Sequence, residues 1–157
     1  MNDEKKLQRT MSMIVVSFVY LFVFGTIAVS TVGMPILRII KPSAVVSVPV
    51  LLGLCVYQFI LKFRNCYTSY FSCTNRILYV NGFLVSAILC VILSFISIGP
   101  LGLGIWGLIL AQICSQAVYN LWKWPLLAHR ELDLTAAQML ATGNKECIRL
   151  FKSFAHR

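Results

Sequence analysis

The sequence predicts an all-α integral membrane protein with four transmembrane helices. Of its 157 residues, 59% are hydrophobic and 12% are charged, whereas about a quarter of the residues in a soluble domain are charged. None of its five carboxylates lies between residues 5 and 130. Because a carboxylate is costly in hydrocarbon, this distribution favours a chain that crosses the bilayer several times.

Four apolar runs follow one another along the chain, and each has the roughly 20 residues that a helix needs to cross hydrocarbon. They cover about residues 11–37, 44–73, 77–98 and 103–122. The short alternating segments typical of a membrane β-barrel do not occur in the sequence. We therefore expect a cytoplasmic N-terminus over residues 1–10, a four-helix transmembrane domain over 11–123 and a cytoplasmic, basic amphipathic tail over 124–157.

The distribution of Lys and Arg predicts that both termini are cytoplasmic. With the N-terminus inside, only Arg38 and Lys41 of the 14 basic residues fall on the outer side, in the loop after the first run. Cytoplasmic loops of membrane proteins carry such an excess of basic residues. The net charge of +9 therefore indicates contact with anionic membrane lipids, and no nucleic-acid partner is expected.

The second run carries polar residues at helical spacing. At 100° per residue, one narrow face holds what we call the polar stripe, and its members follow at spacings of 4, 3, 4, 3 and 4: Gln58, Lys62, Asn65, Ser69, Ser72 and Arg76. A second polar edge beside it holds Arg64, Thr68 and Asn75.

Two interpretations of this run remain open at the sequence level. In one, the span ends near Leu61, and Lys62 and Arg64 extend to the inner headgroups. In the other, the helix continues to Thr74, and the polar stripe faces a protein-lined, water-accessible cavity. The 3–4 spacing favours the continuous helix, because an interfacial loop has no reason to keep it.

The third and fourth runs are joined by a glycine-rich segment. Residues 102–107, GLGIWG, match the dinucleotide fingerprint in their letters, but they lack its preceding strand and its acid about 20 residues further on. A tight turn that glycine permits is the better interpretation.

Two tryptophans, Trp106 and Trp122, lie 16 residues, or about 24 Å of helix, apart. That spacing suits aromatic belts at two interfaces, with Trp124 at the inner one, although ordinary packing is the alternative.

The composition changes after Trp124. We expect Asn144 to cap a short helix with apolar residues on one side and Lys145, Arg149 and Lys152 around it. Such a helix would lie on the inner membrane surface. A partly disordered tail is the alternative.

The candidate site is a binding site rather than a catalytic one. Two histidines and terminal acids assemble neither a catalytic set nor a metal site, so no enzyme activity, metal or cofactor is expected. Cations without partner acids imply an anionic ligand, and a phosphate or pyrophosphate would suit Lys62 and Arg64. The neighbouring residues could hydrogen-bond sugar hydroxyls or complete the cavity lining: Gln58, Asn65, Thr68, Ser69, Ser72 and Arg76. In the fourth run, polar residues line the same cavity or link helices to one another: Gln112, Ser115, Gln116 and Asn120.

The order of these features resembles a known family. The runs YQFILKFRNCYTSYFSCTNRILYVNGFLVSAILCVILSF and GPLGLGIWGLILAQICSQAVYNLW are similar to the C-terminal helices of O-antigen and capsular polysaccharide flippases. These flippases belong to the polysaccharide-transporter branch of the multidrug/oligosaccharidyl-lipid/polysaccharide superfamily, which is MATE-like. The matching features are the small-residue turn Ser72–Arg76, the glycine-rich turn Gly99–Gly107, and a last helix that opens Gly-Leu-Ile-Leu-Ala-Gln.

The resemblance implies translocation of undecaprenyl-pyrophosphate-linked oligosaccharide repeat units across the bacterial inner membrane, in O-antigen, lipopolysaccharide or capsule biosynthesis. It also implies a cationic cavity between two helical lobes, to which Lys62 and Arg64 would contribute. Family members have many more helices than four, and alternating access needs two bundles. The chain is thus expected to be the C-terminal part of a truncated or split flippase that pairs with the missing N-terminal half or with itself. The alternatives are a small oligomeric four-span carrier of lipid-linked sugar and a non-transporting scaffold of a glycan-assembly complex.

Overall fold

The computed structural model of the chain describes residues 2–41 and 47–155. All the elements described are helical: α1 (Asn2–Ala28), a π-helical segment η1 (Val29–Gly33), α2 (Met34–Ile40), α3 (Val48–Cys73), α4 (Val80–Ile98), α5 (Gly104–Ala117), α6 (Asn120–Glu131) and α7 (Ala136–Ala155). The all-α prediction is therefore confirmed for this part of the chain.

Three helices are long and apolar enough to cross a membrane. They cover Glu4–Ile40, Val48–Cys73 and Val80–Ile98, and have 37, 26 and 19 residues. The first contains the predicted helix over 11–37 and continues through η1 into α2. The second and third match the predictions over 44–73 and 77–98 closely, but they begin later, at Val48 and Val80. Residues 44–46 lie outside the described residues.

The predicted fourth helix over 103–122 is not continuous, and this prediction is wrong. α5 ends at Ala117 and α6 begins at Asn120, because Tyr119 leaves the helical conformation with φ −134° and ψ −50°. The indole N–H of Trp122 donates to the freed Val118 carbonyl at 3.0 Å. The bend turns Asn120 and Trp124 into the protein interior, so packing of α6 overrides the helical propensity of the run.

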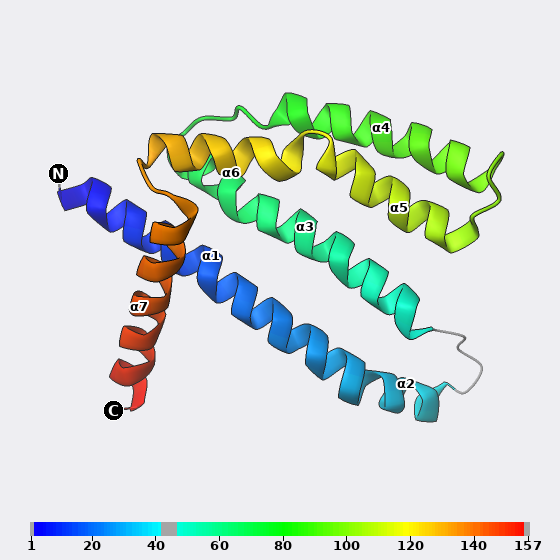
Figure 1. Cartoon of the computed structure of the whole chain (residues 1–157), viewed down its shortest axis with the longest axis horizontal. Helices are drawn as coiled ribbons and strands as arrows, with labels where there is room; N and C mark the ends of the chain where they lie inside the picture. The colour runs from blue at the N-terminus through cyan, green and yellow to red at the C-terminus, as the bar shows by residue number, and fades with distance from the viewer. Residues whose placement is uncertain (1, 42–46, 156–157) are drawn as a thin grey trace.

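The helices form a staggered layer with one crossing helix (Figure 1). α3 packs between α1 on one side and α5 and α6 on the other, and α4 packs against α5 beyond them. α7 returns past α6 and crosses α1 steeply, with close contacts between residues 12 and 20 of α1. Four helices thus meet at one end of the layer.

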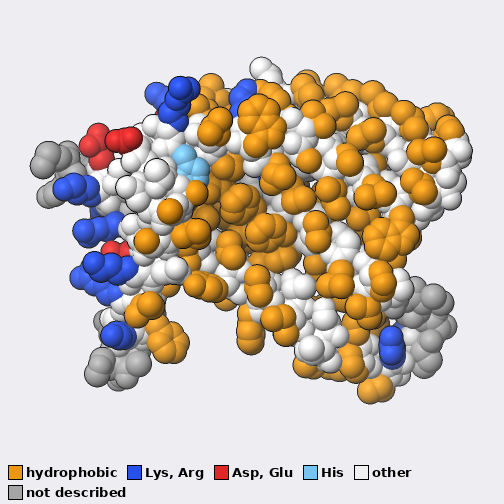
Figure 2. Space-filling model, in the orientation of Figure 1, with side chains coloured by type: hydrophobic (Ala, Val, Ile, Leu, Met, Phe, Trp, Pro, Cys, Tyr) orange, Lys and Arg blue, Asp and Glu red, His pale blue; other side chains and the backbone are white. Residues whose placement is uncertain are grey.

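The hydrophobic core lies at this common end. It joins side chains of α1, α3, α6 and α7, among which Phe71, Trp124, Ala128 and Met139 are almost fully buried. Away from it, large apolar side chains are exposed, such as Phe24 at 72% and Phe95 at 78%. Figure 2 shows this apolar surface over most of the molecule, with basic side chains at its ends. Such an extensive apolar surface needs lipid or a protein partner to cover it.

The boundary expected at residues 123/124 falls inside α6. Trp124 is part of the core, 1% exposed, and its indole N–H donates to Asn120 Oδ1 at 2.8 Å. Its expected place in an aromatic belt is therefore wrong, whereas Trp106 and Trp122 are exposed.

The helix in the tail is longer than expected and starts earlier. It begins at Ala136, after a capping box in which Thr135 N–H donates to Gln138 Oε1 and Gln138 N–H donates to Thr135 Oγ1, at 2.9 and 3.3 Å. Asn144 lies in its interior and accepts a hydrogen bond from Tyr20 at 2.8 Å, so the prediction that Asn144 caps the helix is wrong. Residues 156–157 of the tail lie outside the described residues.

Candidate functional site

The polar stripe lies on one unbroken helix. α3 begins after Ser47 with Pro49 in its first turn, where a missing N–H costs nothing. It then continues for 26 residues to Cys73, about 39 Å. The helix therefore continues past Leu61, as the second interpretation expects, while the depth of Lys62 in the bilayer stays a prediction.

Asn75 ends the helix. It has φ +57°, a conformation that Asn tolerates better than most residues. Its N–H donates to Ser72 O at 3.0 Å, and the N–H of Arg76 donates to Phe71 O at 2.8 Å. These two bonds form a Schellman motif. Arg76 consequently lies beyond the helix and does not continue the polar stripe, contrary to expectation.

The other five residues of the stripe lie on the face of α3 that its neighbours leave open. Gln58, Lys62, Ser69 and Ser72 are exposed and Asn65 is half-buried. The hydroxyls of Ser69 and Ser72 donate to carbonyls one turn back, at 2.8 and 3.2 Å, as is common in helices. The amide of Gln58 and the ammonium of Lys62 are therefore the strongest polar groups on this open face.

The side chain of Arg64 lies on another side of α3 and is only 7% exposed. Its Nη1 donates to Gln116 Oε1 of α5 at 2.6 Å. Its Nε and Nη2 donate to Asn65 Oδ1 at 3.2 and 2.9 Å. The guanidinium carbon lies 3.9 Å from the ring centroid of Phe83 of α4, a cation–π distance. Arg64 thus ties three helices together.

A buried polar network continues from Gln116. Its Oε1 also accepts from Asn120 Nδ2 at 3.1 Å. Asn120 Nδ2 in turn donates to Ser86 Oγ at 2.7 Å and to Gly82 O at 3.4 Å, both on α4. Of the polar residues predicted in the fourth run, Gln116 and Asn120 therefore link helices, and Ser115 donates within its own helix to Gln112 O at 2.9 Å.

The structure does not bring Lys62 and Arg64 to one space. Residues two apart on a helix point about 200° away from each other, and here one side chain is exposed while the other is buried. Thr68 is buried as well, and its hydroxyl donates to Asn65 O at 3.2 Å. The predicted site residues thus divide into an open set around Lys62 and a buried set around Arg64.

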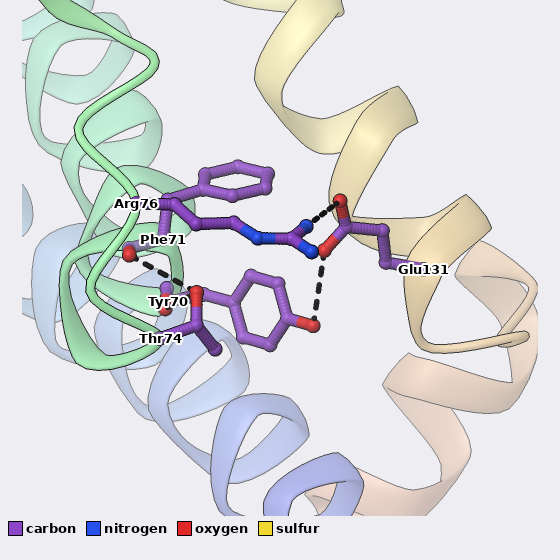
Figure 3. A network of polar contacts seen from close by, with 5 residues as sticks. All are labelled: Tyr70, Phe71, Thr74, Arg76 and Glu131. Carbon is purple, nitrogen blue, oxygen red and sulfur yellow. Dashed lines mark hydrogen bonds and ion pairs between the residues drawn. The ribbon is translucent and has the colours of Figure 1, made fainter.

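Arg76 belongs to a third group (Figure 3). It pairs with Glu131 of α6, with Nη1 2.9 Å from Oε1, and the hydroxyl of Tyr70 donates to the other carboxylate oxygen at 3.3 Å. The side chain of Arg76 is 57% exposed. This cluster fastens the turn after α3 to the end of α6, and its cation already has a counter-ion.

The expected turn between α4 and α5 is shorter than predicted, because it covers residues 99–103 and residues 104–107 already belong to α5. Gly102 and Gly104 have φ of +61° and +55°, which residues with a Cβ atom rarely adopt. A Cβ atom on Gly107 would lie 2.8 Å from Ser97 Cβ, so this glycine allows α4 and α5 to approach closely.

Sequence reasoning missed three residues that shape the site. Ser86 and Trp124 complete the buried network, and Glu131 neutralises Arg76. A signal existed only for Glu131, since it is the first carboxylate after a long stretch without one. Ser86 was unremarkable within an apolar run, because only the packing of α4 against α6 gives it its partner Asn120. Trp124 was expected in an aromatic belt, and its bond to Asn120 one turn back was not predicted.

Comparisons with protein-family models, with curated proteins and with solved structures gave no match.

Proposed function

We propose that the chain is part of a membrane transporter for a lipid-linked oligosaccharide, and that Lys62 contacts the pyrophosphate of this lipid. The single observation that carries the proposal is the open polar face of α3, which holds Gln58, Lys62, Asn65, Ser69 and Ser72 on one uninterrupted helix. The sequence resemblance to O-antigen and capsule flippases supplies the substrate class.

The depth of Lys62 supports a role inside the membrane. The 19 residues of α4 measure about 28 Å, close to the thickness of the hydrocarbon. Phe83 is in the first turn of α4, about 5 Å from its start, and it contacts Arg64. Lys62 lies about 3 Å further along α3, and Gln58 about 6 Å beyond Lys62. If α4 spans the bilayer, both side chains start within the apolar layer.

A lysine and an amide facing lipid at this depth would be costly. A protein-lined, water-filled cavity would remove that cost, and the second wall of the cavity would come from further helices or from a second copy of the chain. Such a cavity with one unpaired ammonium would attract a phosphate-bearing headgroup, and the stripe amides and hydroxyls would bind sugar hydroxyls. Alternating access would then require movement against this second wall.

Arg64 has a different role in this proposal. Because Gln116, Asn65 and Phe83 occupy its guanidinium, we assign it to holding α3, α4 and α5 in register behind the open face. The Arg76–Glu131 pair fastens the inner end of the same assembly. Both termini would be cytoplasmic and the membrane would be the bacterial inner membrane.

Binding of undecaprenyl pyrophosphate to the purified chain in detergent tests the proposal. We expect Lys62→Ala to weaken binding about tenfold, the value of one charge-assisted hydrogen bond, and Lys62→Arg to retain most of it. Lys41→Ala is the matched control, since Lys41 is also exposed but lies in the loop before α3. Equal binding by Lys62→Ala and the unmodified chain would reject the role of Lys62.

A second readout concerns the wall that closes the cavity. Cross-linking from position 58 or 69 in native membranes is expected to capture protein, either a second copy or another polypeptide. Cross-links to bulk phospholipid alone at both positions would show that this face is open to lipid and would reject the cavity.

A further inference from the structure

α7 crosses α1 through a close and fixed contact. A Cβ atom on Gly143 would lie 2.4 Å from Ser12 O and 2.5 Å from Val16 Cγ2, so only glycine allows the two helices to approach this closely. Two polar contacts lie beside the crossing, on its C-terminal side along both helices. Tyr20 donates to Asn144 at 2.8 Å, and Ser17 Oγ lies 3.2 Å from Cys147 Sγ. The steep crossing seen in Figure 1 is thus held by the close approach at Gly143 and by two polar contacts beyond it.

The remaining surface of α7 divides into an apolar and a basic face. The apolar face exposes Leu140, Ile148 and Phe151, at 50%, 59% and 78%. Lys145, Arg149 and Lys152 are exposed on the other face, about 100° away around the helix. In Figure 2 the apolar side chains of this helix point along the direction in which α1 and α3 extend, and the basic ones lie on the opposite edge of the molecule.

This arrangement matches a helix that lies in a membrane interface. If the part of α1 beyond this crossing lies in the bilayer, α7 runs roughly along the membrane plane, with its apolar face toward the hydrocarbon and its basic face toward water. Interfacial amphipathic helices have this distribution, and they bind anionic lipids through Lys and Arg. A tail that packed only against α1 would not need an exposed Phe151 on the side facing the bilayer.

A basic hollow lies between the first turns of α1 and this helix. Its volume is about 400 Å³, and its lining consists of Arg9, Thr142, Lys145, Glu146 and Arg149. Glu146 is 3.9 Å from Arg9 Nε and 3.8 Å from Arg149 Nη1. These ion pairs are long, and their arginines are 60% and 76% exposed, so they are weak. Three cations and one carboxylate leave the hollow with a net positive charge and with free N–H donors.

We propose that α7 lies in the cytoplasmic headgroup layer and that this hollow binds the phosphate of an anionic phospholipid. The two guanidinium groups match the geometry of phosphate oxygens, while the apolar face with Phe151, on another side of the helix, would contact the acyl layer. This inference goes beyond the transport proposal and does not depend on Lys62, which lies on α3.

Thermal unfolding of the purified full chain in detergent tests the proposal. Added phosphatidylglycerol is expected to raise the unfolding temperature more than phosphatidylcholine does. A triple variant should weaken phosphatidylglycerol binding on the order of 100-fold, about fivefold for each lost charge. It combines Arg9→Gln, Lys145→Gln and Arg149→Gln. Arg38→Gln with Lys41→Gln, a control that removes two exposed charges at the far end of α1–α2, should leave phosphatidylglycerol binding unchanged.

Three outcomes would overturn the site. These are equal stabilisation by the two lipids, unchanged phosphatidylglycerol binding by the triple variant, and stabilisation by inorganic phosphate alone that equals that by phosphatidylglycerol. The last would assign the hollow to a free anion. If the triple variant does not fold, Lys145→Gln alone is tested in its place, because Lys145 takes part in neither of the two ion pairs of the hollow. It should show about a fivefold loss, and binding equal to that of the unmodified chain would also overturn the site.

Hydrogen exchange tests the orientation of the helix. In nanodiscs containing phosphatidylglycerol, the amides of 144–155 should exchange more slowly than in nanodiscs of phosphatidylcholine, and Phe151→Asp should abolish the difference. Equal exchange of the unmodified chain in both lipids would overturn the interfacial placement.

Discussion

The two sides of α3 hold their cations in opposite ways. On one side, Lys62 belongs to an exposed polar stripe whose hydroxyls are satisfied within the helix. On the other, Arg64 is buried and bonded to α5 while it stacks on α4. The two residues are only two positions apart in the sequence. Their environments differ because helical geometry turns their side chains about 200° apart. The difference teaches that a cation in an apolar run can stabilise helix packing or remain available to a ligand, and that burial decides which.

The largest expected effect comes from removing Arg64. Arg64→Ala leaves the buried amide oxygen of Gln116 and the half-buried one of Asn65 without their main donor, at a cost of about 2–3 kcal/mol. Lys62→Ala should change stability by less than about 0.5 kcal/mol, as is usual for an exposed site. Unfolding by SDS in mixed micelles would measure both, and similar losses for the two variants would remove the distinction between the two sides.

Asn120 extends the comparison along the buried network. Asn120→Leu should destabilise the chain by about 1–2 kcal/mol, since Ser86 Oγ and the indole N–H of Trp124 lose their partner. A double-mutant cycle with Ser86→Ala should give a coupling of about 0.6 kcal/mol, the average for hydrogen bonds between membrane helices. Asn81→Leu, at an exposed position of α4, is the control, and zero coupling would mean that the Asn120–Ser86 bond does not stabilise the packing.

The Arg76–Glu131 pair should behave like a surface contact. Because the side chain of Arg76 is 57% exposed, Arg76→Ala is expected to cost less than about 1 kcal/mol. Most of this cost should vanish at about 1 M salt, where screening is strong. Arg130→Ala provides a comparison at an exposed arginine outside the described ion pairs. A salt-independent loss of several kcal/mol would instead make the cluster in Figure 3 part of the core.

The smallest effect on stability, and the sharpest test of the two faces, comes from cysteine labelling. In a chain whose native cysteines are replaced, Ser69→Cys should react with a water-soluble maleimide and Thr68→Cys should react far more slowly. Ser69 is exposed and Thr68 is 6% exposed. Equal rates at the two positions would show that α3 is rotated or mobile in the membrane.

The helices and their faces were largely predictable from the sequence. Periodicity in residues 58–72 located the polar stripe, because helical geometry repeats every 3.6 residues. The break between α5 and α6 was not predictable, since Val118 and Tyr119 are ordinary helix residues and Pro125 lies further along. The start of α7 at Ala136 had a local signal, the capping box Thr135–Gln138, whereas its steep crossing of α1 had none.

The residue types of the candidate site were predictable from the sequence. Their separation into an open set around Lys62 and a buried set around Arg64 was not. The spacing of Lys62 and Arg64 was known, but a single helix does not reveal which of its faces meets a neighbour. Gln116, which holds Arg64, is 52 residues away in the sequence. The basic hollow likewise joins Arg9 to Lys145 and Arg149 across the length of the chain.

The amino-acid sequence by itself determined that this protein is helical, apolar and free of carboxylates across its central part, because composition and local periodicity set helix formation and the cost of charge in hydrocarbon. Only the tertiary structure decided which cation is buried, where the last predicted span bends and which way α7 faces. These features depend on partners far apart in the chain, and their energies arise only when packing brings donors, acceptors and apolar surfaces into contact.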